Sequence, residues 1–264
     1  MNVYIPSTGR ATAQHTWAQI PEEWRSSTYI VVPRWEEDDY MAANPGANLV
    51  TTPPDIPKGI SPKRQWILEH AAKQKAESAV MMDDDLHFAE RRKDDPTKFT
   101  RATPQALCYM LNWLARMLVG PHMGGAAHAG IAARQGGNRN TEATIADTRM
   151  SAVLGYHVPT YVKLKLRYDR VPVMEDFDVT LQLLCAGYSN ILLNSVVQDH
   201  GPWNAPGGCS TYRTKELQAQ GARQLALLHP GLVRVVLKQA KGKHPWAERT
   251  DVVVSWKKAR YGKV

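Results

Sequence analysis

This sequence of 264 residues has few cysteines and no long apolar run. Its three cysteines, Cys108, Cys185 and Cys209, include no C-x-x-C pair, and their odd number argues against a disulfide framework. We therefore expect a reducing compartment. No apolar stretch is long enough to cross a bilayer, and the first apolar run meets Pro6 too soon for a signal peptide. These absences predict a soluble cytoplasmic protein without membrane association, and they leave the oligomeric state open.

The chain also lacks internal repeats and any clean interdomain linker. A hydrophobic fraction of 43% and a charged fraction of 22% are ordinary for a globular protein, and the length suits one α/β domain. Lys and Arg number 33 against 25 Asp and Glu, which gives a formal charge of +8. A basic excess favours nucleic acid or phosphate-bearing small molecules as partners, although many basic proteins bind neither.

Apolar patterning predicts strands that alternate with helices along the first half of the chain. We expect strands over residues 3–6, 29–33, 48–50, 78–82, 160–168, 191–197, 233–237 and 252–256. Helices are expected over 13–24, 103–118 and 215–228, with two more beginning at Ser61 and Glu175, and a Gly-rich loop over 124–140. This order predicts a mostly parallel sheet with right-handed crossovers, and such sheets bind ligands beyond the carboxyl ends of their strands.

Three consecutive carboxylates, Asp83, Asp84 and Asp85, follow the predicted buried strand over 78–82. Adjacent carboxylates repel one another, so a fold must offset them with a cation or with hydrogen-bond donors. In an extended segment Asp83 and Asp85 project to the same side and can share one divalent ion. Mg²⁺ or Mn²⁺ suits such ligands and stabilises a diphosphate leaving group. A solvated acidic turn is the alternative, and the buried strand before the triplet favours the metal site.

The triplet at the end of a hydrophobic strand resembles the DxD signature of GT-A type glycosyltransferases. Three segments in order narrow the resemblance to the TET-associated glycosyltransferases of bacteriophages, over roughly the first three quarters of the chain. These segments are residues 3–10 (VYIPSTGR), 59–68 (GISPKRQWIL) and 81–86 (MMDDDL). The resemblance implies a GT-A fold, a Rossmann-like mostly parallel sheet flanked by helices in a single domain over 1–264, with a mixed C-terminal part. Residues 1–100 would be the nucleotide-sugar-binding half and 101–264 the acceptor-binding half.

The resemblance also implies an activity and a set of site residues. The activity is transfer of a sugar from a nucleotide-sugar, with a UDP-sugar favoured, to the hydroxymethyl group of a modified pyrimidine in phage DNA, with 5-hydroxymethylcytosine favoured. A phage protein would act in the host cytoplasm. The implied donor-binding residues are Ser7, Thr8, Gly9, Arg10, Arg64, Asp83 and Asp84, with Asp85 as the metal ligand. Asp83 would meet the ribose or the metal, and Arg64 the nucleobase or the diphosphate.

Arg64 is also a candidate on general grounds, because Lys63 and Arg64 lie in the first turn of a predicted helix. A helix N-terminus favours anions such as a diphosphate. A solvated basic pair is the alternative, and for Lys63 it is nearly as good an interpretation.

A second acidic pair, Glu175 and Asp176, begins another predicted helix. Inverting sugar transfer needs a base that takes the proton of the acceptor hydroxyl, and in inverting GT-A enzymes a carboxylate of a similar segment does this. We predict Asp176 as the base, with Glu175 second and Asp178 third. Acidic residues at a helix start also complement the helix dipole, and this interpretation is about as good.

His200 or Asp199 is a candidate to complete the metal shell, because GT-A enzymes often use a later His or Asp there. A lone loop histidine is more often plain polar surface. The Gly- and Pro-rich segment over 201–213, which holds Trp203 and Arg213, could close over the donor diphosphate.

Three basic features suggest contact with DNA. The first is an outer strand face with Lys163, Lys165 and Arg167, and the second is the Gly-rich loop with Arg134, Asn138 and Arg139. The third is a basic C-terminal part with Trp246 and Trp256 and the cations Lys238, Lys241, Lys243, Lys257, Lys258, Arg260 and Lys263. Each patch alone is better explained as a solvated face, and only their coincidence with the formal charge of +8 favours DNA contact.

Other functions remain open from the sequence. A glycosyltransferase could act on a polysaccharide, lipid or protein acceptor. Paired carboxylates with Mg²⁺ also serve metal-dependent nucleotidyltransferases and other phosphoryl-transfer enzymes. A basic DNA-binding module with a purely structural acidic triplet is the alternative that involves no catalysis. The identity of the sugar and the inverting or retaining outcome are not determined by the residues.

Overall fold

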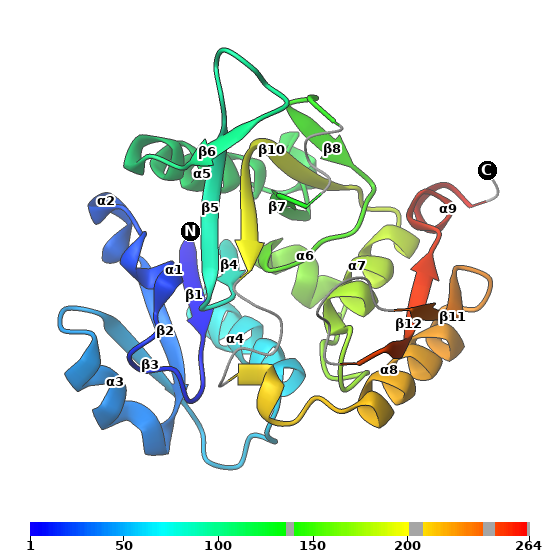
Figure 1. Cartoon of the computed structure of the whole chain (residues 1–264), viewed down its shortest axis with the longest axis horizontal. Helices are drawn as coiled ribbons and strands as arrows, with labels where there is room; N and C mark the ends of the chain where they lie inside the picture. The colour runs from blue at the N-terminus through cyan, green and yellow to red at the C-terminus, as the bar shows by residue number, and fades with distance from the viewer. Residues whose placement is uncertain (136–139, 201–207, 240–245, 263–264) are drawn as a thin grey trace.

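One mixed sheet organises the computed structural model, which describes residues 1–135, 140–200, 208–239 and 246–262 (Figure 1). Its strands are β1 (Asn2–Pro6), β2 (Thr28–Pro33), β3 (Asn48–Thr52), β4 (Ser78–Met82), β5 (Leu86–Arg91), β6 (Phe99–Arg101), β7 (His128–Ala133), β8 (Thr144–Ala146), β9 (Val153–His157) and β10 (Asn190–His200). They are ordered β3-β2-β1-β4-β9-β7-β10-β5-β6, and β8 pairs with β10. β3, β2, β1 and β4 are parallel, and β9, β5, β6 and β8 join antiparallel. The predicted α/β sheet with flanking helices is confirmed, and its C-terminal part is mixed.

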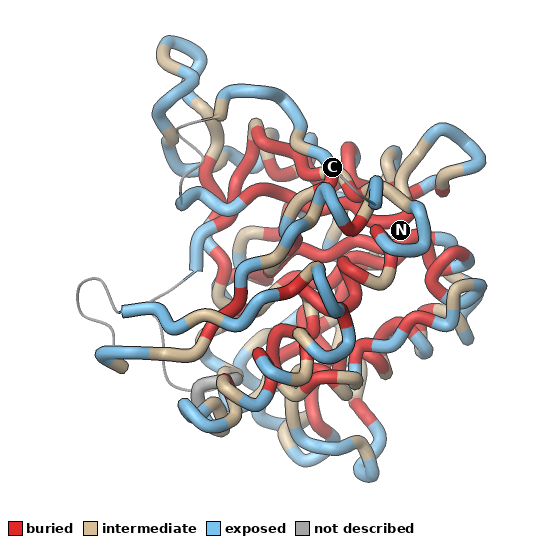
Figure 2. The backbone as a smooth tube through the Cα atoms, turned by 90° about the vertical axis from the view of Figure 1, so that its right-hand side faces the viewer, coloured by how far each residue is buried: buried red, intermediate tan, exposed pale blue. Residues whose placement is uncertain are grey.

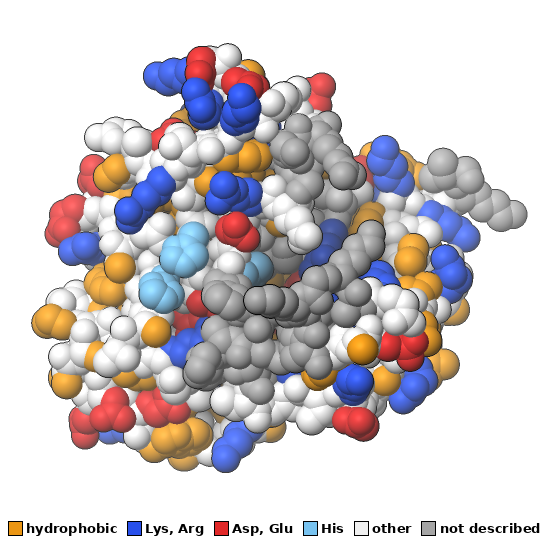
Figure 3. All heavy atoms as spheres, in the orientation of Figure 1, with side chains coloured by type: hydrophobic (Ala, Val, Ile, Leu, Met, Phe, Trp, Pro, Cys, Tyr) orange, Lys and Arg blue, Asp and Glu red, His pale blue; other side chains and the backbone are white. Residues whose placement is uncertain are grey.

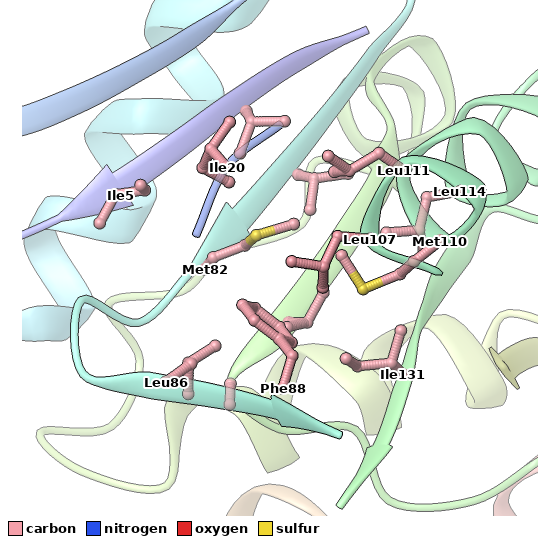
Figure 4. Close-up of a cluster of buried hydrophobic side chains, with 14 of the residues drawn as sticks. Ile5, Ile20, Met82, Leu86, Phe88, Leu107, Met110, Leu111, Leu114 and Ile131 are labelled. Carbon is pink, nitrogen blue, oxygen red and sulfur yellow. The ribbon is translucent and has the colours of Figure 1, made fainter. Parts of the chain in front are cut away.

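Helices cover both faces of this sheet. They are α1 (His15–Ala18), α2 (Glu22–Arg25), α3 (Glu37–Ala43), α4 (Ile60–Lys73), α5 (Pro104–Met117), α6 (Val158–Lys163) and α7 (Glu175–Cys185). Side chains alternate along a strand, so Ile5 of β1 joins a core cluster with Leu111 and Leu114 of α5, whereas Tyr4 joins one with Ile67 and Leu68 of α4. Figure 4 shows the first cluster between α5 and the sheet, and Figure 2 shows the buried backbone concentrated in the interior.

A smaller unit follows the main sheet and is called the C-terminal unit below. It consists of α8 (Lys215–Leu228), the antiparallel hairpin of β11 (Val233–Gln239) and β12 (Glu248–Val254), and α9 (Trp256–Tyr261). Its apolar side chains form a separate core cluster with those of α7. In Figure 1 the unit lies beside α7, away from β1 and β3.

Two predicted elements are wrong. Residues 13–24 form two short helices, because the chain turns at Ile20 and Pro21 before α2 begins. The predicted strand over 160–168 is the helix α6 followed by a turn, in which Lys165 has a φ of 51°. Its apolar and polar residues alternate, yet Val162 is 52% exposed. Pro159 in the first turn of α6 is typical of a helix start.

Two further segments differ from the prediction. The expected loop over 124–140 contains the buried strand β7, whose small residues give little apolar signal. β12 ends at Val254, and Trp256 begins α9. Among the described residues, none of the helices has both the length and the apolar character needed to cross a bilayer.

Candidate active site

The acidic triplet forms a turn between β4 and β5 rather than the expected extended segment. The chain must turn here because β5 pairs with β10 and β6, several strands away from β4. Thr16 holds the turn: its amide donates to the carbonyl of Asp84 at 3.1 Å, and its hydroxyl accepts from the amide of Leu86 at 3.0 Å. Asp83 pairs with Arg64, whereas Asp84 and Asp85 share Arg10.

Asp84 is the buried member of the triplet and points at the loop after β1. Its carboxylate accepts from the Ser7 hydroxyl and forms an ion pair with Arg10 at 2.6 Å. Burial raises the pKa of Asp84, against the lowering effect of Ser7 and Arg10. Tyr40 completes this network, since its hydroxyl lies 2.7 Å from the Ser7 hydroxyl and accepts from the Arg10 amide at 3.0 Å. Burial raises the pKa of Tyr40 to about 12, so it stays a neutral hydrogen-bonding group.

The predicted donor loop, residues 7–10, is thus tied to the triplet. Gly9 has a φ of 66°, a conformation that favours glycine, and its amide donates to the Glu36 carboxylate at 2.7 Å. Lys63 is buried, and its ammonium donates to the Ser7 carbonyl at 2.7 Å and to the Thr8 hydroxyl. The solvated interpretation of Lys63 is wrong: a lysine of α4 supports this loop.

Arg64 links the triplet to the second acidic pair. Its guanidinium donates to Glu175 at 2.6 Å and to Asp83. Arg64 is 4% exposed, and burial among these charges leaves it firmly protonated: despite desolvation, Asp83 and Glu175 raise its pKa well above the usual value. Burial also raises the pKa of Glu175, with Arg64 opposing that effect. Contact of Arg64 with the nucleotide stays a prediction, and the role that the structure shows is this bridge.

Asp176 and Asp178 occupy different environments at the start of α7. Asp176 is partly exposed, and its carboxylate accepts from the Phe177 amide at 3.0 Å. Asp178 is fully buried, with His229 at 2.7 Å and Arg170 at 3.1 Å. A base must reach the acceptor hydroxyl, so the position of Asp178 does not suit that role and its contacts anchor α7 to α8.

Asp85 faces Arg10, at 2.9 Å, and His200 at the end of β10, at 3.8 Å. Although burial raises it, the interactions with His200 and Arg10 lower the pKa of Asp85 below its usual value. The interaction with Asp85 in turn raises the pKa of His200, and the charge of Asp83 adds to this effect. β10 runs three residues further than predicted, so His200 ends a strand that pairs with β5 directly after the triplet.

The carboxylate and imidazole fit a divalent ion. Metal–ligand bonds of about 2.1 Å allow one ion to reach both the Asp85 oxygen and the His200 nitrogen, which lie 3.8 Å apart. In the described part of the chain, no set of three or more His, Cys, Asp and Glu side chains is arranged to hold a metal alone. A pair of protein ligands suits Mg²⁺ or Mn²⁺, since these ions commonly bind one or two protein ligands together with substrate phosphates.

The residues predicted to contact DNA outside the C-terminal cations do not form one surface. Arg167 pairs with Asp169 and with Glu69, at 3.5 Å, and the expected strand face that it shared with Lys163 and Lys165 does not exist. Arg134 lies 3.8 Å from Asp199. Trp256 packs edge-to-face on Phe177, with ring centroids 5.4 Å apart, and belongs to the core of the C-terminal unit. Asn138, Arg139, Lys241, Lys243, Lys263 and Trp203 lie outside the described residues.

A model of the family described as TET-Associated Glycosyltransferase matches residues 1–205. The chain belongs to this family. Membership makes the protein a glycosyltransferase, as the ordered motifs predict. The matched region includes all the carboxylates of the site together with Arg10, Arg64 and His200. The matched region ends before the C-terminal unit, which therefore lies outside what the family model describes.

Solved structures with a similar arrangement are distant. Glucosyl-3-phosphoglycerate synthase from Mycobacterium tuberculosis, in complex with Mn²⁺, UDP and glucosyl-3-phosphoglycerate, aligns with a TM-score of 0.49 and 11% identity over 96% of this chain and 86% of that chain. Its complex with Mn²⁺, UDP-glucose and phosphoglyceric acid gives 0.49 and 13% over 89% and 83%. Mannose-1-phosphate geranyltransferase from Thermus thermophilus gives 0.34 and 12% over 67% and 62%. A comparison with curated protein sequences finds no match.

Sequence reasoning missed several residues that build this site. Tyr40, Gln14 and Thr16 hold the donor loop and the acidic turn through hydrogen bonds that span up to 70 residues of sequence. None carries a local motif. Only the packing of α1 against β5, and of α3 against β2 and β3, brings them together.

Proposed function

We propose that this protein transfers a sugar from a nucleotide-sugar, with UDP-sugars favoured, to the hydroxymethyl group of a modified pyrimidine in DNA, with 5-hydroxymethylcytosine favoured. The observation that carries the proposal is the continuous network from the loop after β1, through the acidic triplet, to the start of α7. It links Ser7 and Arg10 to Asp84, and Asp83 through Arg64 to Glu175. Donor-binding and acceptor-activating groups are thereby held in one rigid frame.

The donor end of the frame consists of residues 7–10 and the triplet. Amides and cations around this loop suit the phosphates of a nucleotide diphosphate. Asp85 and His200, with Asp83 nearby, would hold Mn²⁺ or Mg²⁺, and the ion when bound would neutralise charge on the diphosphate leaving group. Arg10 is placed between Asp84 and Asp85 and favours the ionised form of both carboxylates before any ion binds.

The acceptor end is the start of α7. Asp176 is the proposed base: it is partly exposed, and its carboxylate has a single hydrogen bond, from an amide of its own helix turn, among the described residues. It can therefore accept the proton of an acceptor hydroxyl. Glu175 is buried and bound to Arg64, so its proposed role is to orient this turn.

Two single substitutions test the proposal. Duplexes containing 5-hydroxymethylcytosine are incubated with a panel of nucleotide-sugars and Mn²⁺ or Mg²⁺, and the DNA is analysed by mass spectrometry. Asp176→Asn should lower kcat by about 10²-fold or more with little change in donor KM, because the general base is lost. Asp85→Asn should abolish both transfer and metal-dependent donor binding. Glu77→Gln, at an exposed position outside the site, is the matched control.

The alternative acceptors are tested in the same assay. Transfer to a polysaccharide, lipid or peptide but not to the duplex would contradict the DNA acceptor and leave the donor chemistry intact. Consumption of nucleoside triphosphates without any sugar transfer would instead indicate nucleotidyl transfer. Full transfer by the Asp85→Asn protein would refute the assigned metal site.

A further inference from the structure

Positive charge is strongly segregated along this chain. Residues 206–264, beyond the family match, carry 12 of the 33 Lys and Arg but 3 of the 25 Asp and Glu. Residues 1–205 carry 21 basic and 22 acidic residues, so the glycosyltransferase part is close to neutral. The whole formal charge of +8 therefore originates in the C-terminal segment.

The cations of the C-terminal unit lie on its surface. Arg223 on α8, Arg234 on β11 and Lys257 on α9 are exposed, and none of them pairs with a carboxylate in the described part of the unit. In Figure 3 blue Lys and Arg side chains gather over the side where α8, α9 and the β11–β12 hairpin lie. A surface with so few counter-charges on the protein favours an external polyanion.

Like charges also meet within the hairpin. Lys238 and Arg249 are directly opposite each other in the β11–β12 register, an arrangement that destabilises a strand pair. Asp251 relieves part of this repulsion, with Lys238 at 3.0 Å and Arg249 at 3.2 Å. The hairpin thus retains a repulsive pair that stability alone does not require.

This basic unit is fixed to the helix that carries Asp176. Apolar side chains of α8, β12 and α9 share one core cluster with α7. The buried Asp178–His229 contact, at 2.7 Å, joins α7 to the end of α8. Gly221 of α8 lies so close to the segment before α7 that an added Cβ would come within 2.6 Å of Val173. A polyanion held by the unit would therefore have a fixed position relative to the proposed base.

We propose that the C-terminal unit is a docking surface for duplex DNA, which binds the phosphate backbone and presents the acceptor base to α7. This inference rests on the proposed function. Duplex DNA carries one negative charge per about 1.7 Å of axis, so a rigid surface with cations on three elements engages several phosphates at once. Backbone contacts give position and affinity without sequence preference.

The test compares two triple variants of the full chain. Arg223→Ser/Arg234→Ser/Lys257→Ser removes three cations from the docking surface. Lys73→Ser/Lys93→Ser/Arg116→Ser removes three exposed cations from the glycosyltransferase part and has the same net charge. Binding to an unmodified fluorescent duplex is measured by anisotropy over a series of salt concentrations, and thermal unfolding checks that both variants fold.

The docking variant should bind the duplex more weakly, on the order of tenfold to a hundredfold at physiological salt, and its salt slope should fall by about 3. The control variant should bind like the unaltered protein. The charge-preserving variant Arg223→Lys/Arg234→Lys should retain binding, which separates charge from folding effects. Equal weakening in both triple variants, no binding of the unaltered protein to the duplex, or preferential binding to anionic lipid vesicles or an acidic peptide would overturn the proposal.

Transfer assays separate this inference from the proposed function. With a hydroxymethylated duplex the docking variant should show a raised acceptor KM and an unchanged kcat. With a hydroxymethylated mononucleotide it should match the unaltered protein. If the unaltered protein modifies neither acceptor yet binds the duplex through the three cations, the proposed function fails and the docking surface stands. If it modifies both acceptors and the docking variant behaves like the control, the docking surface fails and the function stands.

Discussion

Replacing Arg64 by methionine should cause a large loss of stability. Arg64 is 4% exposed and donates to Glu175 at 2.6 Å and to Asp83. The Glu175 side chain is only 7% exposed, so removing the guanidinium leaves a buried carboxylate without its counter-charge. Breaking a buried ion pair from one side costs about 3–5 kcal/mol. We expect a loss of that size in the free energy of unfolding.

Urea unfolding followed by circular dichroism measures this loss at pH 7. Two further variants test whether the unpaired Glu175 carboxylate causes the loss of stability. Arg64→Lys keeps the charge but cannot hold two carboxylates with one planar group, so its loss should be intermediate. The double variant Arg64→Met/Glu175→Gln removes the stranded charge and should recover about 1 kcal/mol or more relative to Arg64→Met.

The free energy of unfolding of the Arg64→Met protein should depend on pH. Burial raises the pKa of Glu175, and the loss of Arg64 removes the charge that opposes this effect. In the Arg64→Met protein the folded state should therefore hold a proton on Glu175 that the unfolded state has released. Its free energy of unfolding should increase as the pH falls from 7 toward 5. The reasoning would be refuted if Arg64→Met lost less than about 1 kcal/mol of its free energy of unfolding. It would also be refuted if the double variant Arg64→Met/Glu175→Gln were no more stable than Arg64→Met.

Three further outcomes are expected. Burial lowers the pKa of His128 to about 4, whereas the unfolded side chain titrates near about 6.5. The free energy of unfolding should therefore fall by about 2 kcal/mol as the pH is lowered from 7 to 5, and urea unfolding of His128→Gln should lack this dependence. Gly221→Ala should cost about 1–3 kcal/mol by thermal unfolding, since its Cβ meets Val173, and an unchanged midpoint would show that α8 can shift freely. Lys63→Met should raise the donor KM about tenfold in steady-state assays by releasing Ser7 and Thr8, and an unchanged KM would remove Lys63 from the donor site.

Local sequence was sufficient for the parts of the fold that rest on local signals. α5 and α8 have strong apolar periodicity and begin with a threonine whose side chain accepts from an amide of the first turn, and both were predicted closely. β1, β2 and β4 are short apolar runs bounded by turn residues. The acidic triplet was recognised because it follows such a run. Ambiguous segments were interpreted less well: the alternating residues 160–168 fit a strand pattern, and tertiary packing made them a helix and a turn.

The amino-acid sequence by itself determined the α/β class, the family through its ordered motifs, and the candidate carboxylates, because each depends on residues that are close together in the chain. Only the tertiary structure decided how these residues are connected. Arg64 meets Glu175 across 111 positions, and Ser7 meets Asp84 across 77. Such pairings depend on which strands lie side by side, and strand order is set by the burial of whole faces rather than by any local pattern. The same packing places the basic C-terminal unit against α7.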